Sequence, residues 1–246
     1  MNCYDLLADP LYERSRLVFS DDEMCRINQS HVLVAGVGGV GGFVAEALVR
    51  AGVGKITLVD HDKVSVSNKN RQIVALNSTI GRLKVDVMAE RLLDINPNCQ
   101  VNKIAEFLSP EAMPGLVGSG FDFVVDAIDS LNCKVALVEQ AYIQQVAVVS
   151  SMGAGRRIDP SKIAITDISQ THGCGLARVM RQRLRKLGIK KGVPVIFSSE
   201  LPKDPGPFEA IDGARGRVVN GTASYMPGIF GLMLAGLVVQ KLSQPN

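Results

Sequence analysis

A glycine-rich turn that follows an apolar run sets the strongest limit on how this chain folds. Residues 32–41 read Val-Leu-Val-Ala-Gly-Val-Gly-Gly-Val-Gly, and Asp60 ends a second apolar run about twenty residues on. Gly36 permits a tight turn, Gly38 lets the backbone approach a phosphate, and Gly41 lets a helix pack close to the strand. The N–H groups that open such a helix bind phosphates, and the Asp60 carboxylate would accept hydrogen bonds from ribose hydroxyls. The pattern predicts a nucleotide site without saying which nucleotide binds.

Strands and helices are expected to alternate along residues 1–151. Apolar runs rich in Val, Ile and Leu predict strands at 31–36, 55–60, 100–105, 121–128 and 146–151. Helices are predicted from the Ser20 capping box toward Asn28, at 40–51, at 81–95, from Ser109 onward and at 131–144. Strands that are apolar throughout are typical of parallel sheets covered on both faces. We therefore predict an α/β fold with a Rossmann-like, doubly wound, mostly parallel sheet.

Residues 152–246 are predicted to be a C-terminal extension of the same domain. Strands are expected at 162–168 and 193–198, on either side of a basic helix near 175–187. Residues 199–222 have the composition of a long mobile loop. The apolar run from Met226 to Val239 is broken by proline and glycine and is shorter than the ~20 residues of a membrane span. We expect a buried helix there that packs through its glycines, and no membrane association.

The cysteine pattern bears on metal binding and on compartment. Five cysteines are spread over 246 residues with no C-x-x-C pair, which is not the pattern of a zinc ribbon or a disulfide framework. The first residues lack the basic-then-apolar pattern of a signal peptide. We expect a cytoplasmic protein without zinc.

Polar residues downstream of the turn narrow the choice of nucleotide. Asn68 and Arg71 lie in the loop after Asp60, and Lys84 follows in the next predicted helix. Arginine can bind a phosphate with two parallel hydrogen bonds, and lysine supplies a compact charge. The segment Asp126-Ala-Ile-Asp129 ends the fourth strand, at the sheet edge where ligands bind in such folds, and a carboxylate there suits Mg²⁺. This set predicts a triphosphate site, with the α-phosphate as the point of attack.

In this order the residues resemble those of the ubiquitin-activating superfamily, whose ThiF-type adenylating domain would span residues 1–246. The family binds ATP and Mg²⁺ and adenylates a carboxylate. The resemblance implies a nucleotide site at Gly36, Gly38, Gly39, Gly41, Asp60, Asp62, Asn68, Arg71, Gln72, Lys84, Asp126 and Asp129. It gives catalytic roles to Lys84, Arg71, Arg16 and Asp129, with Asp129 as the Mg²⁺ ligand. Arg16 matches an arginine that reaches into the ATP site of a second subunit, which implies a homodimer.

Two branches of this superfamily are candidates. The activators of sulfur-carrier proteins usually hold zinc with two C-x-x-C pairs, which this chain lacks. The segments 168–172, 176–178, 195–200 and 221–227 resemble instead the tRNA threonylcarbamoyladenosine dehydratases. That branch uses ATP to activate the side-chain carboxylate of the modified adenosine in tRNA. Attack within the activated group then closes a ring with net loss of water. A sulfur-transfer partner protein and a monovalent cation in the C-terminal part are left open.

A basic stripe in the extension suits a polyanionic substrate such as tRNA. The stripe contains no acidic residue and consists of Arg178, Arg181, Arg183, Arg185, Lys186, Lys190 and Lys191. Such a stripe neutralises phosphates and gives salt-dependent binding. A merely solvated helix face is the alternative interpretation of the same residues.

Cys174 lies between two glycines in the segment where some superfamily members carry a thioester-forming cysteine. Ring closure needs no enzyme thiol, so we expect a loop cysteine without a catalytic role. Three other functions stay open at this point. They are activation of the C-terminal glycine of a sulfur-carrier protein, a nicotinamide oxidoreductase on the same glycine turn, and a non-catalytic, nucleotide-gated binder of RNA or protein.

Overall fold

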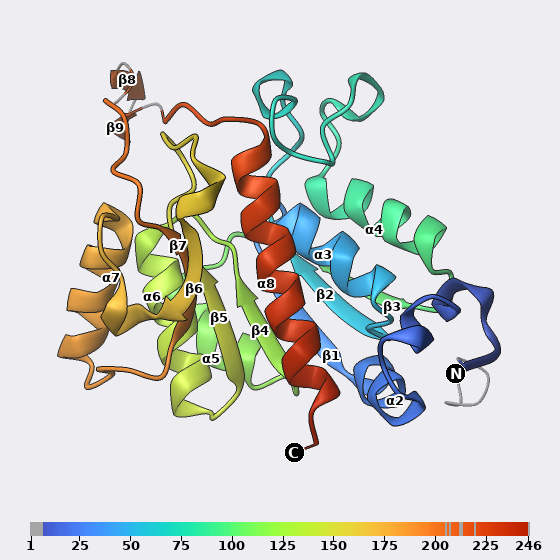
Figure 1. Cartoon of the computed structure of the whole chain (residues 1–246). Coiled ribbons are helices and arrows are strands. Elements are labelled where there is room, and N and C mark those ends of the chain that lie inside the picture. The colour runs from blue at the N-terminus through green and yellow to red at the C-terminus, as the bar shows by residue number, and fades with distance from the viewer. Residues whose placement is uncertain (1–6, 205, 207, 212–213, 219, 246) are drawn as a thin grey trace.

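A seven-stranded sheet organises the chain. The computed structural model describes residues 7–204, 206, 208–211, 214–218 and 220–245. The strands are β1 (His31–Ala35), β2 (Lys55–Val59), β3 (Gln100–Ile104), β4 (Phe123–Asp126), β5 (Ala147–Ser151), β6 (Ile163–Asp167) and β7 (Pro194–Ser198). Their order is β3-β2-β1-β4-β5-β7-β6, and all neighbours pair in parallel except β6 and β7 (Figure 1). The strand order reverses between β1 and β4, which is where such sheets bind ligands at the carboxyl ends of the strands.

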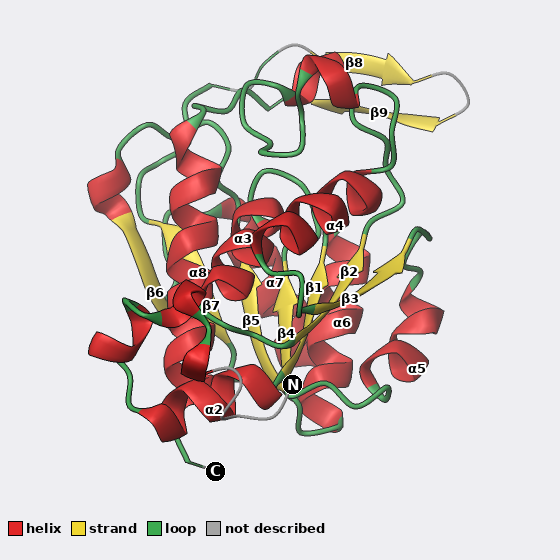
Figure 2. Cartoon of the chain, turned by 90° about the vertical axis from the view of Figure 1, so that its right-hand side faces the viewer, coloured by secondary structure: helices red, strands yellow, loops and turns green. Residues whose placement is uncertain are grey.

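Helices cover both faces of this sheet (Figure 2). They are α2 (Asp21–Gln29), α3 (Gly41–Arg50), α4 (Lys84–Ile95), α5 (Met113–Val117), α6 (Leu131–Ile143), α7 (Gly175–Lys186) and α8 (Tyr225–Ser243). Alternate residues of β1 divide between two cores: Val32 and Val34 pack with α3, α4 and α8, whereas Leu33 and Ala35 pack with α5, α6 and α7. Burial on both faces explains why β1 is apolar throughout, and it confirms the predicted doubly wound α/β fold.

Three local predictions are corrected by the structure. The helix predicted from Gly81 begins at Lys84, because Gly81 has a positive φ of 85° and Leu83 bridges to Lys63. The helix expected from Ser109 is a 3₁₀ turn at Pro110–Ala112 followed by the five-residue α5. The segment 199–222, predicted to be a loop, contains an antiparallel hairpin of β8 (Phe208–Ile211) and β9 (Ala214–Val218).

The cysteines are mostly as expected. Cys99, Cys133 and Cys174 are free and buried. Cys25 is disulfide-bonded, so the expectation from cysteine spacing is wrong at that position.

The apolar C-terminal helix α8 is a core helix that packs against α3. Among the described helices, α8 alone is long and apolar enough to cross a membrane, and 56% of its apolar window is buried inside the molecule. A Cβ on Gly231 would lie 2.5 Å from the Val40 carbonyl oxygen and 2.8 Å from the Phe43 Cβ. The glycine is therefore what lets the two helices approach.

Substitution of this glycine gives a test of the packing. Gly231→Ala is expected to lower the free energy of unfolding by about 1–3 kcal/mol, since the added methyl group overpacks the contact. Gly236→Ala is the matched control, because a Cβ there meets no atom within 4 Å. It should be neutral or stabilise by up to ~1 kcal/mol, as alanine favours a helix. Urea denaturation of both variants checks the pair, and equal losses would contradict the packing argument.

Candidate active site

One cavity of about 890 Å³ opens at the carboxyl ends of the parallel strands, over the point where the strand order reverses. The loop before α4 and the β8–β9 hairpin lie at this same end of the sheet (Figures 1 and 2). The sheet domain lines the cavity with the glycine turn, the loop after β2, Lys84 and residues 106–108, 127–130 and 133. The rest of the cavity lining consists of residues 151–157 and 174–176 with Pro202, Asn220, Thr222 and Pro227. Both the sheet domain and the extension therefore contribute walls.

The glycine turn forms the floor of this cavity. Gly36 has a φ of 92°, and its N–H donates to the Val59 carbonyl at 2.8 Å. A Cβ on Gly36 would lie 2.6 Å from the Ala127 oxygen, and one on Gly41 would lie 1.8 Å from the Gly36 oxygen. Gly36, Gly38 and Gly39 line the cavity, whereas Gly41 is buried in the contact between turn and helix. The turn exposes backbone, which a phosphate can approach closely.

Asp60, Asp62 and Lys84 form a charged cluster beside the turn. Asp60 accepts hydrogen bonds from the N–H groups of Val37 and Asp62, each at 2.8 Å. The Lys84 ammonium lies 2.6 Å from an Asp62 carboxylate oxygen and 4.0 Å from one of Asp60. The Lys84 side chain is only 6% exposed, so the two carboxylates hold its charge at the cavity wall.

Backbone pairing in the loop after β2 brings Lys84 to this place. The N–H of Val64 donates to the Arg82 carbonyl at 2.8 Å, and the N–H of Gly81 donates to the Val64 carbonyl at 2.9 Å. The Lys84 N–H then donates to the Asp62 carbonyl at 3.0 Å. The loop folds back on itself, so α4 starts directly beside the end of β2.

Three further predicted residues line the same cavity: Asn68, Arg71 and Gln72. Arg71 donates to the Ser67 carbonyl at 3.0 Å and to the Asn70 side chain at 2.9 Å. Gln72 is 8% exposed, and its Oε1 is buried without a hydrogen-bond partner. A buried acceptor with no partner is costly unless a ligand supplies a donor.

The two aspartates after β4 lie in different surroundings. Asp129 lines the cavity, but Asp126 does not, because it is fully buried beneath it. The Lys134 ammonium lies 2.7 Å from Asp126 Oδ2, and the Ser150 hydroxyl donates to the same oxygen. Burial raises the pKa of Asp126, and the Lys134 charge opposes this shift. The placement predicted for Asp126, facing a nucleotide, is therefore not what the structure has.

Arg16 lies outside the cavity of its own chain, in the short helix Ser15–Leu17 next to α2 (Figure 1). Its guanidinium donates to Asp21 at 3.1 Å and to the Leu7 carbonyl at 2.6 Å. The side chain is 39% exposed. It is thus available at the surface and contributes nothing to the cavity described above.

Comparison with known proteins assigns the family. A sequence model of the ThiF family matches residues 12–246. The chain belongs to the ThiF family. It is 41% identical over 239 residues to the tRNA threonylcarbamoyladenosine dehydratase of Bacillus subtilis, with 94% of each chain covered. Two crystal structures of the Escherichia coli tRNA N6-threonylcarbamoyladenosine dehydratase TcdA, one with ATP and one with AMP, are each 35% identical to it. Their TM-scores are 0.85 and 0.84, with 93% of this chain and 91% and 92% of theirs covered.

Two consecutive arginines of this ThiF-family chain line the cavity and were not among the predicted site residues. Arg157 is 4% exposed, and its guanidinium donates to the carbonyls of Gly153, Gly155, Gly173 and Glu200. Arg156 lies beside it with a positive φ of 62°. Their position just after the carboxyl end of β5 was the signal that could have found them.

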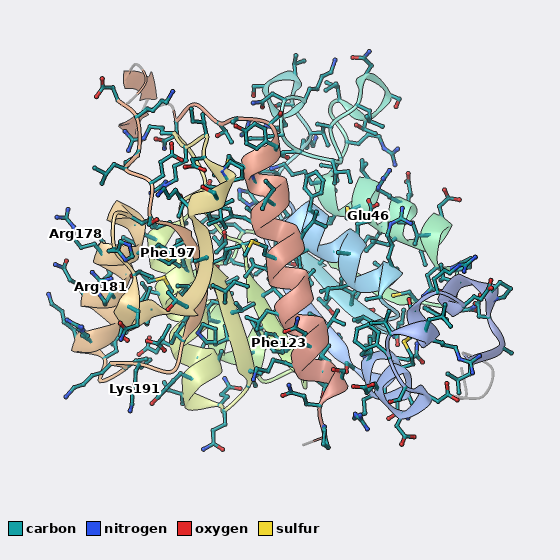
Figure 3. All side chains as sticks on the ribbon, viewed as in Figure 1. Glu46, Phe123, Arg178, Arg181, Lys191 and Phe197 are labelled. Atoms are coloured by element: carbon teal, nitrogen blue, oxygen red, sulfur yellow. The ribbon has the colours of Figure 1, made fainter. Side chains whose placement is uncertain are left out.

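The basic stripe lies on α7 and in the turn after it. Arg181 donates to the Thr171 carbonyl at 2.9 Å, and Arg183 donates to the Asn132 side chain. Within the described residues, no side-chain hydrogen bond or ion pair is made by five of these residues, all of them exposed: Arg178, Arg185, Lys186, Lys190 and Lys191. Arg178, Arg181 and Lys191 all lie on the α7 side of the molecule (Figure 3).

Burial increases along the three residues that lead into α7, from the exposed His172 to the buried Cys174. Cys174 is 6% exposed and lines the cavity at the N-cap of α7. The His172 ring packs edge-on against Phe197. His61 lies 3.4 Å from Asp62 and packs against Phe107. Asp60, His61 and Asp62 each have one atom that could bind a metal ion, and these three atoms lie within 4.8 Å of one another.

Proposed function

We propose that this chain is an ATP-dependent tRNA threonylcarbamoyladenosine dehydratase of the cytoplasm. The observation that carries the proposal is the continuous cavity, which runs from the glycine turn to walls made by the extension. About 890 Å³ is at the upper end of the range for ligand sites, so a nucleotide and a second reactant can meet there. The 41% identity to a dehydratase over nearly the whole chain supports the same substrate class.

The nucleotide half suits ATP. The glycine turn offers backbone N–H groups to phosphates, and Asp60 has lone pairs left for ribose hydroxyls after its two backbone hydrogen bonds. The unpartnered Gln72 oxygen needs a donor, which a bound nucleotide or its water shell would supply. Lys84 and Arg71 both line this half of the cavity. Asn68 lines the same half.

The reaction follows from this placement. A carboxylate oxygen of the substrate attacks the α-phosphorus of ATP, and the bond to pyrophosphate breaks. Lys84 and Arg71 stabilise the negative charge that develops on the phosphate oxygens. A nitrogen of the same substituent then attacks the acyl carbon, loses its proton, and expels AMP. The oxygen lost from the carboxylate leaves on AMP, so the nucleoside loses one water overall.

Mg²⁺ fits this site through Asp129, whose carboxylate lines the cavity. The ion would neutralise charge on the phosphates. The group of Asp60, His61 and Asp62 is a weaker candidate, since the Lys84 ammonium already lies against Asp62. We propose no monovalent cation, because Arg157 already uses the carbonyl oxygens that gather in the extension.

A homodimer is part of the proposal. Arg16 is exposed and would enter the cavity of a second copy. Helix α8 also leaves Tyr225 and Leu232 at the surface, 46% and 54% exposed, which a second copy could cover. A molar mass of one chain, measured by sedimentation at micromolar concentration, would contradict this.

The exposed cations of α7 are proposed to contact tRNA phosphates. Replacing Arg185 and Lys186 with glutamine is expected to weaken binding of any tRNA and to lower the slope of log affinity against log salt by about 1–2. Lys103→Gln is the matched control, since β3 lies at the opposite edge of the sheet from β6. Filter binding at several salt concentrations measures both. An unchanged slope in the double variant would mean that these two residues do not contact tRNA and belong to a merely solvated helix face.

One experiment tests the central claim. The protein is incubated with ATP, Mg²⁺ and tRNA carrying threonylcarbamoyladenosine, and the nucleosides are analysed by mass spectrometry. We expect the modified nucleoside to lose the mass of one water, with AMP and pyrophosphate released only when that tRNA is present. A parallel reaction replaces the tRNA with a sulfur-carrier protein that ends in glycine. ATP–pyrophosphate exchange in that reaction alone would favour the sulfur-carrier activators instead.

A further inference from the structure

The cavity has two halves of different charge. The nucleotide half carries the carboxylates of the lining, which are Asp60, Asp62, Glu106 and Asp129. The half formed by residues 151–157, 174–176, 202, 220 and 222 contributes no carboxylate to the lining, and it contains two arginines. A ligand group bound in this second half is therefore expected to be anionic.

Only one of the two arginines is available to such a group. The Arg157 guanidinium is buried and already donates to four backbone carbonyls. The Arg156 side chain has no hydrogen bond or ion pair within the described residues, and it is partly exposed in the cavity wall. Arg157 therefore has a structural role in the cavity wall, whereas the guanidinium N–H groups of Arg156 are available to a ligand.

The backbone of Arg156 is held in a conformation that arginine rarely adopts. Its φ of 62° is in the left-handed region, where a residue with a side chain is strained. Its N–H donates to the Gly221 carbonyl at 2.8 Å, and its own carbonyl accepts from the Lys203 N–H at 2.8 Å. Lys203 precedes the β8–β9 hairpin and Gly221 follows it, so the segments on both sides of the hairpin hold the backbone of Arg156.

The same region is tied to the nucleotide half. The Asn70 side chain donates to the Thr222 carbonyl at 3.1 Å, next to Arg71 in the nucleotide loop. The Tyr225 hydroxyl donates to the Ile158 carbonyl at 2.7 Å. Arg156 pairs with Gly221, next to Thr222, so it lies where the extension meets the nucleotide loop. A carboxylate bound there would lie beside the nucleotide half of the cavity.

We propose that Arg156 binds the reacting carboxylate of the modified adenosine and orients it for attack. This rests on the proposed function and adds the residue that selects the modified nucleoside over plain adenosine. Guanidinium binds carboxylate with two parallel hydrogen bonds, which fixes its direction as well as its place. The strained backbone is retained because it aims this side chain into the cavity.

The test compares two tRNAs with two variants. Wild-type protein with a non-hydrolysable ATP analogue is expected to bind tRNA carrying threonylcarbamoyladenosine about 10- to 100-fold more tightly than the unmodified transcript. Arg156→Gly should abolish that preference, and the glycine relieves the positive φ, so the fold is not put at risk. Arg156→Lys should keep part of the preference, since its charge lacks the paired donors. ATP affinity should stay unchanged in both variants.

Other results would overturn the proposal. If Arg156→Gly weakens both tRNAs equally, the side chain contacts a phosphate. If Arg156→Gly still prefers the modified tRNA as the wild type does, or if the wild type shows no preference, Arg156 does not bind the carboxylate. If ATP affinity falls as well, the residue is structural. Water loss catalysed by the wild type is measured in the same samples, so failure of the proposed function would be seen separately.

Discussion

Lys84→Ala is expected to slow the release of AMP and pyrophosphate by about 10²- to 10³-fold, the loss usual for one well-placed charge-stabilising donor. The Lys84 side chain is 6% exposed and held by Asp62 at 2.6 Å, so its ammonium is fixed before ATP arrives. When phosphates enter, this charge would be shared between the carboxylates and the α-phosphate. Positioning before the reaction is what makes one cation effective.

Lys69→Ala is the control for this prediction. Lys69 belongs to the same loop and loses the same charge, but it is exposed, donates to Asn77 and does not line the cavity. Its turnover should match the wild type. The affinity for ATP is measured separately by calorimetry, because loss of Lys84 also leaves Asp60 and Asp62 without their cation. Normal turnover by Lys84→Ala would remove Lys84 from the proposed chemistry.

Much of the nucleotide half could be predicted because its signals are local. The turn from Gly36 to Gly41 needs residues without a Cβ, and the sequence shows them directly. The placement of Lys84 beside Asp62 was also predictable in outline, since β2 and α4 are joined by one loop. The detailed start of α4 was not, because it depends on the pairing of Lys63 with Leu83.

The extension was less predictable because its contacts are distant in sequence. The Arg157 guanidinium donates to the carbonyl oxygens of residues 153, 155, 173 and 200, and no local sequence pattern indicates that these four residues lie close together. The β8–β9 hairpin was missed because a segment rich in glycine, proline and charge has the composition of a loop. Arg156 has an unusual φ that is visible only once Lys203 and Gly221 are seen on either side of it.

Asp126 shows why motif order alone cannot assign roles. It stands three residues before Asp129 at the end of β4, so the two look alike in sequence. Strand alternation and the short turn after β4 send one carboxylate down to α6 and the other into the cavity. The partners that decide this are Lys134, on α6, and Ser150, on the neighbouring strand.

Lys134→Met is therefore expected to destabilise the fold by about 3–5 kcal/mol, because it leaves a fully buried carboxylate without its counter-charge. Adding Asp126→Asn should recover a large part of this loss. The amide is neutral: its oxygen can still accept from the Ile128 N–H, and its NH2 group can donate to the Ser150 hydroxyl oxygen. ATP affinity of the double variant should remain near the wild-type value, since neither residue lines the cavity.

The pH dependence of stability separates this explanation from simple loss of packing. Burial raises the pKa of Asp126, and without Lys134 nothing of comparable charge opposes the shift. A carboxyl whose pKa is raised in the folded state stabilises the fold below its unfolded pKa of about 4, and this contribution is lost as pH rises through the folded value. Lys134→Met should thus lose more stability at pH 8 than at pH 5, relative to the wild type. The double variant should show no such difference in urea denaturation, and an equal loss at both pH values would mean that Asp126 is not charged in the core.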